Sequence, residues 1–158
     1  MDSNTTTTSK KERKRRLLAA AVYLESIPKD CWDHFDMNEW YQTTKASEGE
    51  REGAPDEAAA LLVCGTTACA GGWLCMVPEF RLLGLRLRRR RGYVCPDYSG
   101  RPFVAGNGFE VLQQFFALSK KQSTSVFHGS GYRLPHQRPV TPLDVAKRLR
   151  ELAAEVLR

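Results

Sequence analysis

The hydrophobic and polar positions near the start of the chain follow the pattern of an amphipathic helix, which we predict over residues 10–26. Ser9 and Glu12 have the spacing of a capping box at its start, and Pro28 ends it. The apolar face consists of Leu17, Ala20, Ala21 and Leu24. Residues 1–8, which precede this helix, are polar and rich in threonine, so we expect them to form a disordered tail.

The segment that follows is mostly polar. Asp36 and Glu39 repeat the capping-box spacing just before Trp40, which predicts a short helical turn in the segment DMNEWYQ. Residues 43–58 are polar and rich in turn-forming residues, and we expect a flexible surface loop there.

A second helical pattern follows this loop, and we expect the helix to begin near Thr66 or Thr67 and to end at Pro78. The residues on its apolar face are Cys69, Trp73, Met76 or Val77, and Phe80. Strands are predicted only over residues 83–104, where two leucines alternate with arginines before a turn-rich segment. We expect two or three short strands in this range, in a small basic hairpin.

Helical patterns return in the last third of the chain. Asn107 and Glu110 cap a third predicted helix, and Ser119 and Gln122 cap a fourth that runs to about Phe127. Residues 128–140 have no regular pattern, and the last helix begins at Thr141, Pro142 and Asp144. Its predicted apolar stripe is Leu143, Ala146, Leu149, Leu152, Ala153 and Val156.

These elements predict a single α+β domain over residues 9–158, mostly helical, with about five helices packed around the Cys69–Trp73 helix. A chain of 158 residues is long enough to bury one hydrophobic core without disulfides or metals. It contains no apolar run of the length that a membrane span needs, and its first residues lack the apolar stretch of a secretory signal. We therefore expect a cytoplasmic protein that does not associate with a membrane.

Charge changes this picture because it is strongly segregated. The chain has 24 Lys and Arg against 18 Asp and Glu, a net charge of +6, but residues 10–16 (KKERKRR) and 86–91 (RLRRRR) are densely basic. The segment from Glu25 to Glu57 is strongly acidic. Clustered arginine is typical of phosphate binding, of a solvated strand edge, or of a surface that pairs with an acidic segment of a second copy. The candidate anion-binding residues are Arg86, Arg88, Arg89, Arg90 and Arg91, with Arg13, Lys14, Arg15 and Arg16.

Cysteine chemistry provides a second hypothesis. Cys69 is predicted in the first turn of a helix, where the helix dipole lowers a thiol pKa, so it is a candidate nucleophile for a hydrolase or transferase. The candidate bases are His34 and His128, with His136 as a third imidazole. The alternative is that Cys69 is an inert core thiol, because it shares its stripe with large apolar residues. The cysteine spacing does not match a zinc site, for which the only plausible ligands are Cys64, Cys69, Cys95 and His128.

Four groups of residues give a resemblance to a protein family. The chain resembles a widespread group of small uncharacterised phage and bacterial proteins with a C-G-T-x-x-C-x-x-G-W motif. The matching residues are Phe35-Asp36-Met37 with Trp40, Cys64-Gly65-Thr66 with Cys69, Gly72 and Trp73, Phe116-Ala117-Leu118-Ser119 with Gln122 and Phe127, and Thr141-Pro142 with Val145 and Ala146. The resemblance implies a compact, mostly helical cytoplasmic domain that is often encoded by a phage. The loop at 43–58 and the run of arginines from Arg86 to Arg91 depart from the group's pattern.

Together these observations favour a binding protein over an enzyme. We expect a phage or mobile-element accessory factor whose basic hairpin contacts nucleic acid, a nucleotide, or a host nucleoprotein such as a defence complex. We expect no cofactor and no metal, because no phosphate-binding loop or dinucleotide fingerprint is present. The other hypotheses are the Cys69-dependent enzyme and an interaction module that forms a homo-oligomer through its basic and acidic segments.

Overall fold

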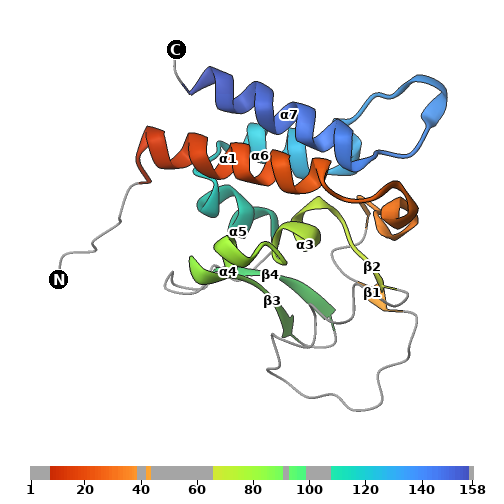
Figure 1. The fold of residues 1–158 in the computed structure, drawn as a ribbon, viewed down its shortest axis with the longest axis horizontal. Helices are drawn as coiled ribbons and strands as arrows, with labels where there is room; N and C mark the ends of the chain where they lie inside the picture. Colours follow the sequence, from red (N-terminus) through yellow and green to blue (C-terminus); the bar gives the residue numbers. More distant parts are fainter. Residues whose placement is uncertain (1–7, 39–41, 44–65, 91–92, 99–107, 157–158) are drawn as a thin grey trace.

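A computed structural model describes residues 8–38, 42–43, 66–90, 93–98 and 108–156 of the chain. The first and last described helices, α1 (Lys10–Glu25) and α7 (Pro142–Glu155), lie side by side and run antiparallel (Figure 1). Both helix starts agree with the sequence. Ser9 Oγ accepts a hydrogen bond from the Glu12 N–H over 3.1 Å, and Thr141 and Asp144 form a complete capping box.

In Figure 1, helix α5 (Gly108–Phe115) lies below this pair and α6 (Lys120–Phe127) lies behind it, in contact with α5 and α7. The capping box of Ser119 and Gln122 is complete, which confirms the predicted start of α6. The centre of the core is a group of fully buried aromatic rings in contact, namely Phe80, Phe115, Phe116 and Phe127. Burial of these large side chains is the main stabilising contribution to the fold.

The middle of the chain differs from its prediction. Thr66–Thr67 do not begin a helix; they form strand β2, which pairs with β1 (Gln42–Thr43) in an antiparallel register. The helix begins at Ala70 instead, as α3 (Ala70–Leu74). Pro78 does not end this run: Val77 is extended, and Pro78 occupies the first turn of a new helix, α4 (Pro78–Leu82). Proline suits that position because the first helical N–H needs no partner within the helix.

The predicted basic hairpin is present. Strands β3 (Leu85–Arg90) and β4 (Tyr93–Tyr98) pair antiparallel, with Leu85 opposite Tyr98 and Arg90 opposite Tyr93. Leu85 and Leu87 are buried, so β3 packs one face on the core. Residues 99–104, where a third strand was conceivable, lie outside the described residues.

Several smaller predictions need correction or fall outside the described residues. Gln42, at the end of the segment predicted as a helical turn, lies in β1 instead. A short 3-10 helix, η1 (Lys29–His34), comes before this segment. Leu143 is 44% exposed, because the buried stripe of α7 contains Val145 in its place. The range 128–140 contains two 3-10 turns, η2 (Gly129–Gly131) and η3 (Pro135–Gln137). Residues 1–7 of the predicted tail at 1–8, and most of the loop at 43–58, lie outside the described residues.

The described residues thus form an α+β fold that is mostly helical, as the sequence predicts. They contain six α-helices where about five were expected, because the predicted second helix is divided into α3 and α4. None of these helices combines the length and the apolar character that crossing a membrane would require.

Candidate anion-binding surface

The hairpin holds two of the predicted arginines on its exposed side. Arg86 and Arg88 are exposed, while Leu85 and Leu87 between them are buried, because side chains alternate across a strand. Arg88 is 58% exposed, and its Nη1 lies 3.3 Å from Oδ2 of Asp97 on the neighbouring strand. The pairing of β3 with β4 therefore holds both arginines on the same exposed side of the hairpin.

The remaining hairpin arginines are placed by their backbone alone. Arg89 and Arg90 continue β3, in register with Val94 and Tyr93 of β4. Arg91 lies outside the described residues. The strand thus brings four of the five predicted hairpin arginines into one short ribbon, in which consecutive residues are about 3.4 Å apart.

The basic start of α1 is partly neutralised by its own helix. Glu12 accepts hydrogen bonds from Arg15 and Arg16, each with a shortest N–O distance of 2.8 Å. The hydrogen bond from Arg15, followed by that from Arg16, lowers the pKa of Glu12 to about 2. Arg15 also forms an ion pair with Glu79 of α4. Two of the four predicted cations on this helix therefore already have carboxylate partners within the chain.

Arg16 is buried and belongs to the core rather than to a binding surface. Its Nη1 donates a 2.6 Å hydrogen bond to the backbone carbonyl of Phe115, and its guanidinium carbon lies 4.5 Å from the centre of the Phe115 ring. Only 7% of the residue is exposed. Arg16 therefore links α1 to the end of α5.

A second basic surface forms where the first turns of α1 and α6 meet. Arg13 Nη2 donates a 3.2 Å hydrogen bond to Oε1 of Gln122, which joins the two helix starts. Arg13 Nε is buried and makes no hydrogen bond within the described residues. The side chains of this surface, which we call the α1–α6 basic cluster, are Lys10, Arg13, Lys14, Lys120 and Lys121.

Sequence reasoning missed two members of this cluster. Lys120 and Lys121 are exposed, and no carboxylate within the described residues lies within 4.0 Å of either ammonium group. They are a short basic pair in an otherwise neutral stretch, so the surrounding sequence does not indicate a basic surface. The contact between Arg13 and Gln122 brings the first turn of α6, which contains both lysines, against the start of α1.

The geometry does not favour Cys69 as a nucleophile. Cys69 is 2% exposed at the N-cap of α3, and this burial raises the pKa of its thiol to about 12 despite the opposing effect of the Gly72 and Gly71 N–H groups. A thiol with that pKa is protonated near neutral pH and is a poor nucleophile. The structure thus supports the alternative interpretation of Cys69 as a core residue.

The two candidate bases also have other contacts. The His34 carbonyl accepts hydrogen bonds from the Ala68 N–H at 2.9 Å and from Trp73 Nε1 at 3.3 Å, which holds η1 against the segment that contains Cys69. His128 lies at the end of α6, where its Nδ1 is 2.6 Å from Ser130 Oγ. Within the described ranges, no hydrogen bond joins either imidazole to the Cys69 thiol.

The other candidate zinc ligands are not grouped in the described part of the chain. Cys95 is buried in β4, His128 is exposed at the end of α6, and Cys64 lies outside the described residues. Across the ranges that the structure describes, no three His, Cys, Asp or Glu side chains are arranged to hold a metal ion.

The chain was compared with protein-family models, with curated protein sequences and with solved structures. No match was found in any of the three. The resemblance to small phage and bacterial proteins therefore stays a prediction, and the geometry of the two basic surfaces is the basis for a proposed function.

Proposed function

We propose that the protein binds nucleic acid without catalysis, through the outer face of the hairpin β3–β4. The supporting observation is the fixed exposure of Arg86 and Arg88 on a strand whose other side is anchored in the core. Within the described residues, Asp97 is the one carboxylate that forms an ion pair with these two guanidinium groups. Guanidinium groups bind phosphate oxygens in a bidentate geometry, which suits a phosphate backbone.

The α1–α6 basic cluster supplies a second set of phosphate contacts in this proposal. Its lysines lie at two helix N-termini, where the partial positive charge of the helix dipole also favours an anion. Arg15 and Arg16 are excluded from this role, because both form ion pairs with Glu12 and Arg16 also donates to the Phe115 carbonyl. Lys120 and Lys121 take their place in the proposed surface.

The proposal is tested by the salt dependence of binding. Fluorescence anisotropy with a labelled DNA duplex should give an affinity that falls steeply with salt, with a slope of about −0.9 in log K against log salt for each phosphate contacted. The variants Arg86→Ala and Arg88→Ala should each weaken binding and reduce this slope by about one.

Arg138→Ala is the matched control, because Arg138 is also an exposed arginine but forms a bidentate ion pair with Asp144 away from the hairpin. It should leave the slope unchanged. Replacing Lys120 and Lys121 together measures the contribution of the α1–α6 basic cluster to binding, independently of the hairpin. Equal affinity for wild type and the Arg86 and Arg88 variants, or affinity that does not change with salt, would reject the hairpin as the binding surface.

The resemblance supports a narrower form of this proposal, in which the protein is a cytoplasmic accessory factor of a phage or mobile element. A host nucleoprotein, such as a defence complex, then offers the same phosphates as free nucleic acid. Affinity capture from a host lysate with and without nuclease treatment distinguishes the two. Capture that survives nuclease and loss of Arg86 and Arg88 would indicate a protein partner instead.

A further inference from the structure

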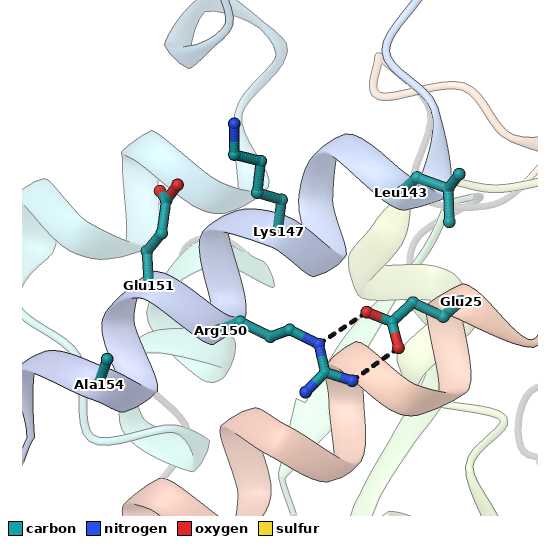
Figure 2. Close-up of a pocket in the computed structure, with 6 residues that line it drawn as sticks. All are labelled: Glu25, Leu143, Lys147, Arg150, Glu151 and Ala154. Carbon is teal, nitrogen blue, oxygen red and sulfur yellow. Dashed lines mark hydrogen bonds and ion pairs between the residues drawn. The ribbon is translucent and has the colours of Figure 1, made fainter.

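The outer face of α7 is a continuous exposed stripe on the side of the helix opposite its buried face. At 100° per residue, the five residues of this stripe fall within an arc of about 100°. They are Leu143, Lys147, Arg150, Glu151 and Ala154. With Glu25 of α1 they line a shallow groove between the two helices (Figure 2). We call this surface the α7 outer face.

The charges on the α7 outer face are of two kinds. Arg150 is occupied within the chain, because it donates to both carboxylate oxygens of Glu25, at 2.7 and 2.6 Å. Lys147 and Glu151 are exposed and point away from α1, and within the described residues neither has an ion-pair partner (Figure 2). The face thus presents one unpaired cation and one unpaired anion, one helical turn apart.

Apolar side chains accompany these charges. Leu143 at the start of α7 is 44% exposed. Ala154, near the other end of the stripe, is small and exposed. The distance along the helix from Leu143 to Ala154 is about 16 Å, at 1.5 Å per residue.

We propose that the α7 outer face binds the same face of a second copy of the chain, with the two α7 helices antiparallel about a two-fold axis. In this arrangement Lys147 of each copy meets Glu151 of the other, because both lie two residues from position 149. Leu143 then lies near Ala154 of the other copy, since these positions are almost symmetric about the same point. A two-fold interface repeats each contact, so two ion pairs and two apolar contacts form together.

Charge complementarity selects a second copy over other occupants. A strongly acidic or basic partner would leave either Glu151 or Lys147 opposite a like charge, whereas an antiparallel copy pairs both. One helix face is small compared with the roughly 800 Å² per partner of a stable interface, so the dimer is weak and its formation depends on concentration. The hairpin lies on the opposite side of the molecule from α7 (Figure 1), so both hairpins stay accessible in this dimer.

Charge reversal tests the interface. Sedimentation equilibrium on the full chain without nucleic acid should show a monomer–dimer equilibrium for the wild type. Lys147→Glu alone and Glu151→Lys alone should each weaken dimerisation by about tenfold or more, because every reversal replaces two attractions with two repulsions. The double variant Lys147→Glu/Glu151→Lys should restore dimerisation, since the two charges are exchanged and the pairing is the same.

Lys121→Glu is the control, as it makes the same charge change on the α1–α6 basic cluster and should leave dimerisation unchanged. Circular dichroism confirms that each variant is folded.

A wild type that stays monomeric across the accessible concentrations overturns the inference. So does a dimer that Lys147→Glu leaves intact, or one that the double variant fails to restore. A dimer weakened only by Lys121→Glu would overturn the inference and place the interface on the α1–α6 basic cluster instead. DNA binding by the hairpin is measured separately, so failure of one proposal does not decide the other.

Discussion

Replacing Arg16 with methionine tests whether this arginine is a structural residue. The substitution preserves most of the side-chain length but removes the 2.6 Å hydrogen bond to the Phe115 carbonyl, the 2.8 Å contact with Glu12, and the stacking on the Phe115 ring. A buried hydrogen bond from a charged donor contributes about 1.5–3 kcal/mol. Cation–π stacking in a desolvated site adds about 1–2 kcal/mol.

Part of this loss is offset, because methionine buries more apolar surface than arginine, by about 1 kcal/mol. We therefore expect the free energy of unfolding to fall by about 3 kcal/mol, which for a chain of this size lowers the Tm by roughly 6–12 °C. Urea denaturation followed by circular dichroism measures the change.

The control for this prediction is Arg15→Met, one position earlier on the same helix. Arg15 is 46% exposed and forms surface ion pairs, so its loss should cost less than about 1 kcal/mol. DNA binding by Arg16→Met should equal that of the wild type at a temperature where both are folded. An Arg16 variant as stable as the Arg15 variant, or one that loses DNA affinity while folded, would refute the reasoning.

Three other predictions concern acid stability, backbone packing and thiol reactivity. The pKa values of Glu12 and Asp144 are each lowered to about 2, by hydrogen bonds from arginines, so their stabilising contributions are complete above about pH 5 and are lost as the pH falls towards 2. In Glu12→Gln and Asp144→Asn, the free energy of unfolding should therefore fall less steeply between about pH 5 and pH 2 than in the wild type. An unchanged pH dependence in this range would contradict the lowered pKa values. Gly131→Ala should destabilise the fold by about 2 kcal/mol, because the added Cβ would lie 2.8 Å from a backbone oxygen of α6. Gly129→Ala is the control, because the nearest atom to its added Cβ would lie at 3.4 Å. In the same urea assay it should change stability by less than about 0.5 kcal/mol. Iodoacetamide at neutral pH should modify Cys69 only after unfolding, as mass spectrometry of native and denatured samples can show, and rapid labelling of the native thiol would revive the nucleophile hypothesis.

Elements with local signals could be predicted from the sequence. The starts of α6 and α7 depend on a side chain and a backbone N–H three residues apart, and both capping boxes form as predicted. The hairpin was recognisable because Leu85 and Leu87 alternate with arginines, which is a pattern of neighbouring residues. These signals need no information about the rest of the chain.

Elements that depend on distant partners could not be predicted in this way. Thr66–Thr67 are extended because they pair with Gln42–Thr43, a segment more than twenty residues earlier. Leu143 is exposed because the buried side of α7, which contains the fully buried Val145 and Leu149, points away from it.

The candidate site shows the same division. Glu12 lies three and four residues before Arg15 and Arg16, so their ion pairs are a local feature of the sequence that charge counting alone overlooks. The burial of Arg16 against Phe115 depends on how α1 packs on α5, which no local pattern reveals. The same is true of the cluster that Lys120 and Lys121 form with the start of α1.

The pairing of α1 with α7 has a consequence for biosynthesis. The apolar face of α1, with Leu17 and Leu24 fully buried, is covered largely by a helix that leaves the ribosome more than a hundred residues later. Until α7 emerges, this face lacks its main native partner, and the nascent chain exposes it to chaperones and to other chains. Emergence of α7, rather than of α1 alone, is therefore the event that allows α1 to bury its apolar face.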